Sequence, residues 1–325
     1  MHPAFSVIFL TTLIGVGQGM FLAMFTVESY SAFDLLPPQS DAFYGYGSAL
    51  ALVFMGLGLV ASFFHLGRPE RAFRTITQWR TSWLSREVIV MPAFMGVLFL
   101  YGAAHLSGFN PVLGWLPGDV PVTITAVLGT AGTVLAFALF LCTGMIYACL
   151  RFLREWHTPL TVINYVLLGG ASGFTLATAY CAWAAPELVP FMAGWAAILT
   201  VLALFSRGAS LIRNTRLKPK STVQTAIGVK HPKIVQKTQG AMGGSFNTRE
   251  FFHGKSVAFL RSIKWVFLFA VFVIPTVILG AGVAGGTVVL LGTAFVVQYL
   301  GLLAERWFFF AQANHPQNLY YQSVA

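Results

Sequence analysis

Eight long apolar stretches, each clear of charge through its middle, constrain this chain more than any other feature. An α-helix needs about 20 mainly apolar residues to cross the hydrocarbon core of a bilayer. The stretches are Ala4–Thr26, Tyr44–Phe64, Val88–His105, Val122–Leu150, Leu160–Ala184, Leu188–Phe205, Ala258–Gly280 and Gly286–Phe309. Because each run is continuously apolar rather than alternating, helices are predicted and not the strands of a β-barrel. We therefore expect an all-α, polytopic membrane protein with eight transmembrane helices.

Charge distribution predicts how these helices are oriented. Charged residues make up only 9% of the 325 residues. Almost every lysine and arginine outside the helix ends falls in three connections, which are His65–Glu87, Arg151–His157 and Arg207–Lys255. The alternate connections together carry acidic side chains and no lysine or arginine, and they are Val27–Phe43, Leu106–Pro121, Ala185–Glu187 and residues 281–285. The positive-inside rule places the basic connections in the cytoplasm, with both termini there because eight is even.

A weak internal repeat favours two four-helix halves within one transmembrane domain of residues 1–325. PAFSVIFLTTLIGVGQGMFLA, from Pro3, resembles PLTVINYVLLGGASGFTLA, from Pro159. Both segments contain closely spaced glycines, which let helices approach their neighbours. The repeat predicts halves of about residues 1–150 and 151–325, with the first helix of each half in an equivalent position.

The longest connection, about residues 206–257, is basic and rich in Gly, Ser and Thr. It is too polar to cross a membrane. Two interpretations remain open, a solvated tether that binds anionic lipid headgroups or a docking surface for a soluble partner. Nucleic acid is not expected as a partner, because aromatic residues do not interleave the charges.

The connection HLGRPERAFRTITQWRTSWLSRE, His65–Glu87, concentrates five arginines, two glutamates and a histidine between two apolar runs. A lipid-soluble quinone entering from the hydrocarbon needs hydrogen-bond donors and groups that exchange protons. Neutral His65 can do both, because the pKa of histidine lies near physiological pH. Glu87 could relay protons, and the neighbouring cations could stabilise a singly reduced quinone anion or hold a partner protein. These cations are Arg68, Arg71, Arg80 and Arg86.

Structural interpretations of the same residues compete with the chemical one. His65 could cap the last carbonyl groups of the second helix. Glu87 could complement the N-terminal dipole of the third helix or form an ion pair with Arg86. The other arginines could simply determine topology, as positive-inside residues do.

The middles of the eight runs contain no ionisable residue, which argues against a proton pump or an ion-coupled transporter. No pair of histidines lies inside the predicted helices, so haem b is not expected; a shallow haem on His157 and His253 is the alternative. His105 lies alone at the opposite face and is expected to be structural. The three cysteines are too few for an iron–sulfur cluster, and we expect no metal site and no catalytic centre in this chain.

HLGRPERA and SWLSRE, together with the opening MHPAFSVIFLTTLIGVGQG, resemble the membrane anchor subunits of the dimethyl sulfoxide (DMSO) reductase family, the DmsC type of the NrfD-like group. The resemblance implies a complex with a molybdopterin catalytic subunit and a subunit that carries four [4Fe–4S] clusters. The anchor of such a complex has no redox cofactor of its own and exchanges electrons with the ubiquinone or menaquinone pool. The quinone-associated histidine and glutamate of the family coincide with His65 and Glu87.

The long basic loop departs from the DMSO reductase anchor and looks more like the anchors of cytoplasmic sulfite dehydrogenase complexes of sulfur-oxidising bacteria. Such a complex would deliver electrons to quinone, whereas a DMSO or polysulfide reductase would draw them from quinol. The partner subunits are expected on the cytoplasmic side, docked at Arg74, Arg151, Arg154 and Arg213. Two alternatives remain, an anchor without quinone chemistry and a transporter that binds an organic anion with its arginines.

Overall fold

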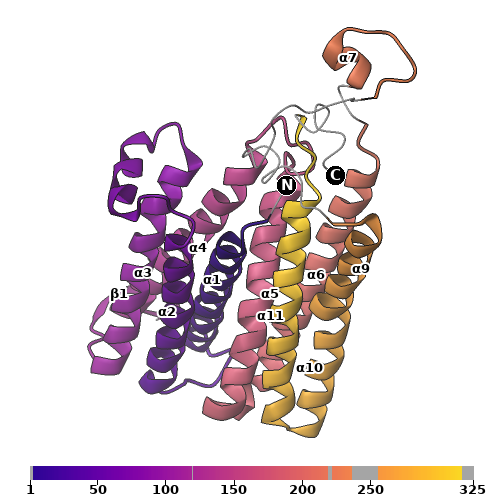
Figure 1. The fold of residues 1–325 in the computed structure, drawn as a ribbon. Coiled ribbons are helices and arrows are strands. Elements are labelled where there is room, and N and C mark those ends of the chain that lie inside the picture. Colours follow the sequence, from indigo (N-terminus) through magenta and orange to yellow (C-terminus); the bar gives the residue numbers. More distant parts are fainter. Residues whose placement is uncertain (1–2, 119, 219–221, 236–254, 317–325) are drawn as a thin grey trace.

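The computed structural model describes residues 3–118, 120–218, 222–235 and 255–316. Within these ranges, eight helical spans are long and apolar enough to cross a membrane, which confirms the predicted number. They run side by side as a bundle (Figure 1). Their bounds are α1 Phe5–Ala32, α2 Asp41–Phe63, α3 Trp83–Ser107, α4 Ile124–Ala148, α5 Pro159–Ala184, α6 Val189–Thr215, a seventh span made of α9 Val257–Leu268, the π-helical η3 Phe269–Val273 and α10 Ile274–Gly285, and α11 Val288–Ala311.

Short elements occupy the connections. They are the 3-10 helix η1 Pro69–Gln78, the antiparallel strands β1 Val112–Leu116 and β2 Val120–Thr123, the 3-10 turn η2 Pro186–Leu188, and α7 Val223–Ile227. The strands correct the all-α expectation. The turn between them contains Gly118 at φ +89°, a conformation that glycine adopts without steric cost. The fold is therefore nearly all-helical, with one small hairpin between α3 and α4.

The two ends of the bundle differ in charge. We call the end with the α2–α3, α4–α5 and α6–α9 connections the basic end, and the end with β1 and β2 the hairpin end. Phe5 and Ala311, at the outer limits of α1 and α11, lie at the basic end, as an even number of spans requires; this end is uppermost in Figure 1. Which end faces the cytoplasm stays a prediction.

Several helices extend beyond the apolar runs. α1 continues past Thr26 to Ala32 and carries Glu28, while α6 continues past Phe205 to Thr215 and carries Arg207. Sequence patterning places both charged residues in connections. Their side chains have partners inside the protein, as described below, so the helices can continue through them. The connection after α6 accordingly begins about ten residues later than expected, and the expected turn at 281–285 is helical, with the break at Gly286.

α1 and α5 form the centre of the bundle. In each, 72% of the most apolar window is buried, against 28–39% in the other spans. Glycines bring the two helices into contact, since a Cβ atom on Gly19 would lie 2.4 Å from the carbonyl oxygen of Gly169. A Cβ atom on Gly173 would similarly lie 2.2 Å from the backbone of Gly19. These glycines belong to the two repeated segments; the grouping into four-helix halves stays a prediction.

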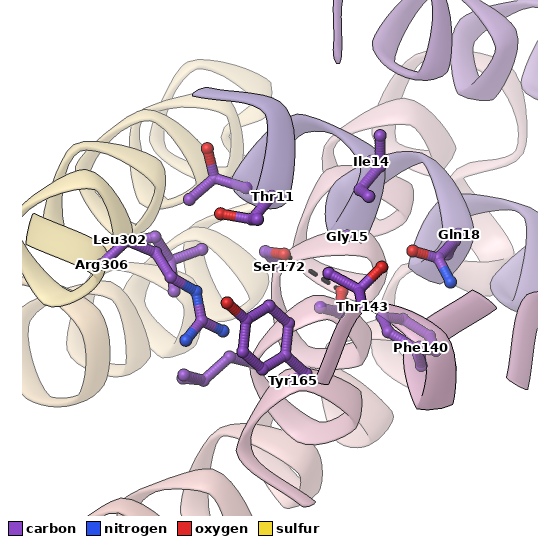
Figure 2. Close-up of a pocket in the computed structure, with 13 residues that line it drawn as sticks. Thr11, Ile14, Gly15, Gln18, Phe140, Thr143, Tyr165, Ser172, Leu302 and Arg306 are labelled. Atoms are coloured by element: carbon purple, nitrogen blue, oxygen red, sulfur yellow. Dashed lines mark hydrogen bonds between the residues drawn. The ribbon is translucent and has the colours of Figure 1, made fainter. Parts of the chain in front are cut away.

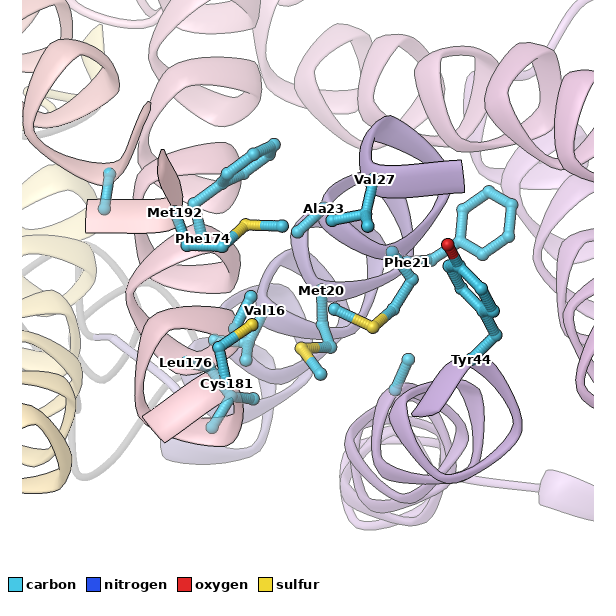
Figure 3. Close-up of a cluster of buried hydrophobic side chains, with 14 of the residues drawn as sticks. Val16, Met20, Phe21, Ala23, Val27, Tyr44, Phe174, Leu176, Cys181 and Met192 are labelled. Atoms are coloured by element: carbon cyan, nitrogen blue, oxygen red, sulfur yellow. The ribbon is translucent and has the colours of Figure 1, made fainter. Parts of the chain in front are cut away.

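Apolar side chains fill the middle of the bundle between its two ends. Met20 and Phe21 of α1 are completely buried there (Figure 3). The ring of Phe21 packs edge-on against Phe94 and Tyr101 of α3, at centroid distances of 5.4 and 5.5 Å. This apolar layer separates the polar groups of the basic end from those of the hairpin end.

Candidate functional site

His65 lies just beyond the end of α2, where its side chain is exposed. Partial burial lowers the pKa of His65, and a hydrogen bond with the backbone of Ala61 opposes this effect. The imidazole is therefore neutral at neutral pH, able to donate a proton from one ring nitrogen and to accept one at the other.

The arginines of this connection divide into two groups. Arg86, at the start of α3, donates from Nε to the carbonyl of Trp79 and from Nη2 to that of Arg80, both at 2.9 Å. Its guanidinium also lies 4.2 Å from the ring centroid of Trp83. Arg86 therefore closes the turn between η1 and α3. The remaining arginines are exposed, and they are Arg68, Arg71, Arg74 and Arg80.

Glu87 is buried in the first turns of α3, with 6% of its surface exposed. Its Oε1 accepts a hydrogen bond from the hydroxyl of Thr143 on α4. No ion pair in the described part of the chain includes Glu87, so the expected alternative of a pair with Arg86 is not found. Because a hydroxyl both donates and accepts, Thr143 can serve Glu87 as carboxylate or as carboxylic acid. Glu87 is thus suited to take up and release a proton.

Thr143 connects Glu87 to a polar interior. It lines a cavity of about 10 Å³ between α1, α4, α5 and α11, which is room for about one water molecule. Figure 2 shows Thr11, Thr143, Tyr165 and Arg306 around this cavity. The space is far too small for a quinone ring.

Three buried charges, each at most 3% exposed, form a cluster that reaches this cavity through Arg306. Arg207 Nε of α6 is 2.7 Å from Glu305 Oε1 of α11, and Arg306 Nη1 is 3.4 Å from Glu305 Oε2. The guanidinium of Arg306 lies 3.8 Å from the ring centroid of Tyr165. The cluster carries one net positive charge inside the basic end.

Sequence reasoning missed this cluster, although two signals pointed to it. Glu305 and Arg306 are adjacent opposite charges inside the last apolar run. Arg207 is followed by further apolar residues, Leu211 and Ile212, before the next arginine. Such a pattern allows a helix to continue through the first arginine.

The four residues expected to dock a partner lie at the basic end, in two different settings. Arg213 donates to the carbonyls of Arg154 and His157, at 3.0 and 3.2 Å, and Arg154 donates to that of Lys218. These two arginines join the α4–α5 connection to the end of α6. Arg74 and Arg151 are exposed. Docking by any of the four stays a prediction.

Of the two histidines in the haem alternative, His157 and His253, the structure describes His157. His157 Nδ1 lies 2.6 Å from the carbonyl oxygen of Ala148, at the end of α4, and serves as a helix-terminal hydrogen-bond donor. His253 lies outside the described residues, as does much of the basic loop. The absence of haem stays a prediction.

At the hairpin end, His105 is not alone, contrary to expectation. It lies on α3 between two carboxylates, with Nδ1 3.0 Å from Asp41 Oδ1 and Nε2 3.7 Å from Glu28 Oε1. Glu28 also accepts hydrogen bonds from the hydroxyls of Tyr101, at 2.6 Å, and Thr125. The extension of α1 beyond Thr26 is what brings Glu28 to this histidine.

Comparison with known proteins agrees with the resemblance noted in the sequence. The family model described as DMSO reductase anchor subunit (DmsC) matches residues 1–311. The sequence is 58% identical to the C subunit of the sulfite dehydrogenase of Allochromatium vinosum over 325 residues, the full length of both proteins. It is 26% identical to the C polypeptide of the anaerobic dimethyl sulfoxide reductase of Haemophilus influenzae over 161 residues, 50% of this protein and 51% of that one. With the whole bundle matched, the protein belongs to the family of DMSO reductase anchor subunits.

Proposed function

We propose that this protein is the quinone-reactive anchor of a sulfite dehydrogenase complex and passes electrons from an iron–sulfur partner to quinone at the basic end. Membership of the family makes it a membrane anchor subunit of a DMSO reductase-type oxidoreductase complex. The full-length relative is named for sulfite oxidation. Oxidation of sulfite to sulfate releases two electrons and two protons, and a quinone takes up two electrons and two protons to become quinol.

The buried carboxyl of Glu87 is the observation that carries this proposal. It lies near the basic end, has a hydroxyl partner that fits either protonation state, and has no cation paired with it among the described residues. A structural carboxylate at that depth would be expected to have a cationic partner. We assign Glu87 the role of proton carrier to a quinone bound at the lipid-facing surface of this end.

His65 and the exposed arginines complete the assignment. His65 is neutral and accessible, so it can donate a hydrogen bond to a quinone oxygen and pass a proton to it. Arg68, Arg71 and Arg80 are exposed cations that attract the charge developing on a quinone as it is reduced. Arg86 stabilises the turn that joins the segment with these arginines to α3.

The partner proteins follow from the same assignment. An iron–sulfur subunit with four [4Fe–4S] clusters would dock at the basic end, through Arg74 and Arg151, and would receive electrons from a molybdopterin catalytic subunit. The positive-inside rule places this end in the cytoplasm of a bacterial inner membrane. We propose no haem and no metal ion bound to the anchor itself.

The decisive experiment replaces Glu87 by Gln in the intact complex. Loss of general acid–base catalysis lowers rates by about 100-fold or more, so we expect about that loss of sulfite-dependent quinone reduction. Sulfite oxidation with a soluble artificial electron acceptor should be unchanged, because the catalytic subunit is untouched. Glu70→Gln is the matched control at an exposed carboxylate of the same connection and should retain full activity.

The alternatives give different results in the same preparation. Full quinone reduction by Glu87→Gln and His65→Ala complexes would favour an anchor without quinone chemistry. Quinol oxidation driven by DMSO or polysulfide, with no sulfite activity, would favour a reductase that draws electrons from the pool. A transporter would move organic anions in vesicles that contain this protein alone.

A further inference from the structure

A large cavity opens at the hairpin end, on the opposite side of the apolar layer from Glu87. Its volume is about 760 Å³, within the range of small-molecule sites. The end of α1, the α1–α2 connection, the end of α3, strand β2 and the start of α4 surround it, and most of its lining is apolar. Val127 of α4 and Phe25 of α1 lie on its apolar walls.

The polar part of the lining includes two acidic side chains and a histidine, Glu28, Asp41 and His105, together with hydroxyl and amide side chains. His105 is 97% buried, since 3% of its surface is exposed. Its Nε2 has no partner within hydrogen-bond distance among the described residues, and Glu28 Oε1 lies 3.7 Å away. Asp41 is the most accessible of the three, with 61% of its side chain exposed. A buried polar atom without a partner is uncommon in native proteins and calls for an explanation such as an absent ligand.

The charges at this end restrict the ligand. The connections that meet here contain no lysine or arginine, so an anionic headgroup such as phosphate is disfavoured. Ionised Glu28 and Asp41 only accept hydrogen bonds. A ligand that satisfies them must therefore donate hydrogen bonds, as a hydroxyl group does.

A second, apolar cavity lies next to the first. It has a volume of about 300 Å³ and shares Phe25 and Ser29 with the larger cavity. Phe137, Phe174 and Trp195 line it, between α1, α4, α5 and α6. A cavity with charged side chains in its lining, next to an apolar cavity, fits a molecule with a compact headgroup and a hydrocarbon tail.

We propose that the hairpin-end cavity binds a quinol, with a ring hydroxyl donating to Asp41 or Glu28 beside His105 and the isoprenoid tail in the groove at Phe137 and Trp195. This site is separate from the Glu87 site and lies at the other end of the bundle. It is a binding site and carries no electron-transfer step, and it stands on its own geometry whether or not quinone is reduced at Glu87.

The experiment uses the intact complex in lipid nanodiscs and a photoreactive azido-ubiquinone, reduced to the quinol before illumination. Peptide mapping by mass spectrometry should place label within residues 25–44 and 120–131. Val127→Trp fills the cavity, and Asp41→Asn removes an acceptor; we expect each to lower this label about tenfold, which corresponds to one lost hydrogen bond or an equivalent steric cost. Val134→Trp is the matched control, an exposed valine of the same helix that lines neither cavity.

Three results would overturn the proposal. They are label confined to residues 65–87, equal labelling of the Val127→Trp and Val134→Trp complexes, and a phospholipid that stays in the cavity when quinol is added in excess. The Glu87→Gln complex separates this proposal from the proposed function. Lost turnover with hairpin-end label retained supports both, whereas retained turnover with that label still present overturns only the role of Glu87.

Discussion

The basic end and the hairpin end each hold a glutamate inside the bundle, the buried Glu87 and the half-buried Glu28, and the surroundings of the two differ. Glu87 has one hydroxyl partner and a neighbouring cavity of about 10 Å³, while exposed arginines lie on the surface nearby. Glu28 has two hydroxyl partners and a histidine, beside a cavity of about 760 Å³ at an end without lysine or arginine. The proposed quinone reduction draws on the cations and the buried carboxyl of one end, and the proposed quinol site on the cavity at the other.

This comparison shows that charge in the connections and charge inside the bundle are distributed differently between the two ends. Loop charge differs between the ends in the way that membrane orientation requires. Charged clusters appear at both ends, as Arg207–Glu305–Arg306 at the basic end and as His105 between the half-buried Glu28 and the exposed Asp41 at the hairpin end. In the basic-end cluster Glu305 offsets one of the two arginines, so one positive charge is left inside the bundle.

Removing the central acid of the basic-end cluster should have the largest effect. Glu305→Gln leaves Arg207 and Arg306 buried without a counter-charge. Breaking a buried ion pair in this way costs about 3–5 kcal/mol, and we expect that loss in the free energy of unfolding, measured by thermal or denaturant unfolding in mild detergent. Glu187→Gln, at the hairpin-end surface, should change it by less than about 0.5 kcal/mol. Equal stability of the two variants would show that the cluster does not stabilise this end.

A smaller loss should follow from the same kind of change at the hairpin end. Tyr101→Phe removes a hydroxyl that donates to Glu28 at 2.6 Å and leaves a mostly buried carboxylate short of one donor. The expected cost is about 1–3 kcal/mol, read in the same unfolding assay. Tyr46→Phe, on the exposed face of α2, is the matched control and should be nearly neutral. If Tyr101→Phe were as stable as the control, Glu28 would have to be neutral or hydrated.

How much of this was predictable depends on which contacts each feature requires. The eight spans and the charged connection at His65–Glu87 follow from local composition, so the sequence alone predicts them. The Arg207–Glu305 pair and the His105–Asp41 pair join residues about 100 and 64 positions apart, so only the packed bundle brings them together. The strands at Val112 and Val120 were missed for a similar reason, because a short hairpin is specified by pairing and by one glycine turn.

The pH dependence of turnover should sharpen the role of His65 by a smaller, severalfold effect. Its pKa is lowered by burial, so the imidazole stays neutral until the pH falls below the ordinary histidine value of about 6.5. As the pH falls through the lowered pKa, His65 gains a proton and becomes a stronger proton donor to the quinone, which takes up protons as it is reduced. Quinone reduction should therefore be level near pH 7 and rise only on the acid side, and His65→Gln should remove this rise. A rise that begins above pH 7 and disappears in the variant would contradict the assignment.

The last prediction is that turnover moves no protons across the bundle, and it tests whether the two ends exchange protons. Met20, Phe21 and Phe94 fill the bundle between Gln18 and Glu28 of α1, so no chain of polar side chains joins Glu87 to His105 among the described residues. If sulfite is oxidised and quinone reduced at the basic end, the two protons released there equal the two taken up. Proteoliposomes with an enclosed pH dye should then show turnover with no acidification of the lumen, for either orientation of the complex. Glu87→Gln liposomes, which are expected not to turn over, are the control and should give the same dye signal. Acidification of the hairpin-end compartment that depends on turnover would mean that the apolar layer opens during the reaction, and the separation of the two ends would no longer hold.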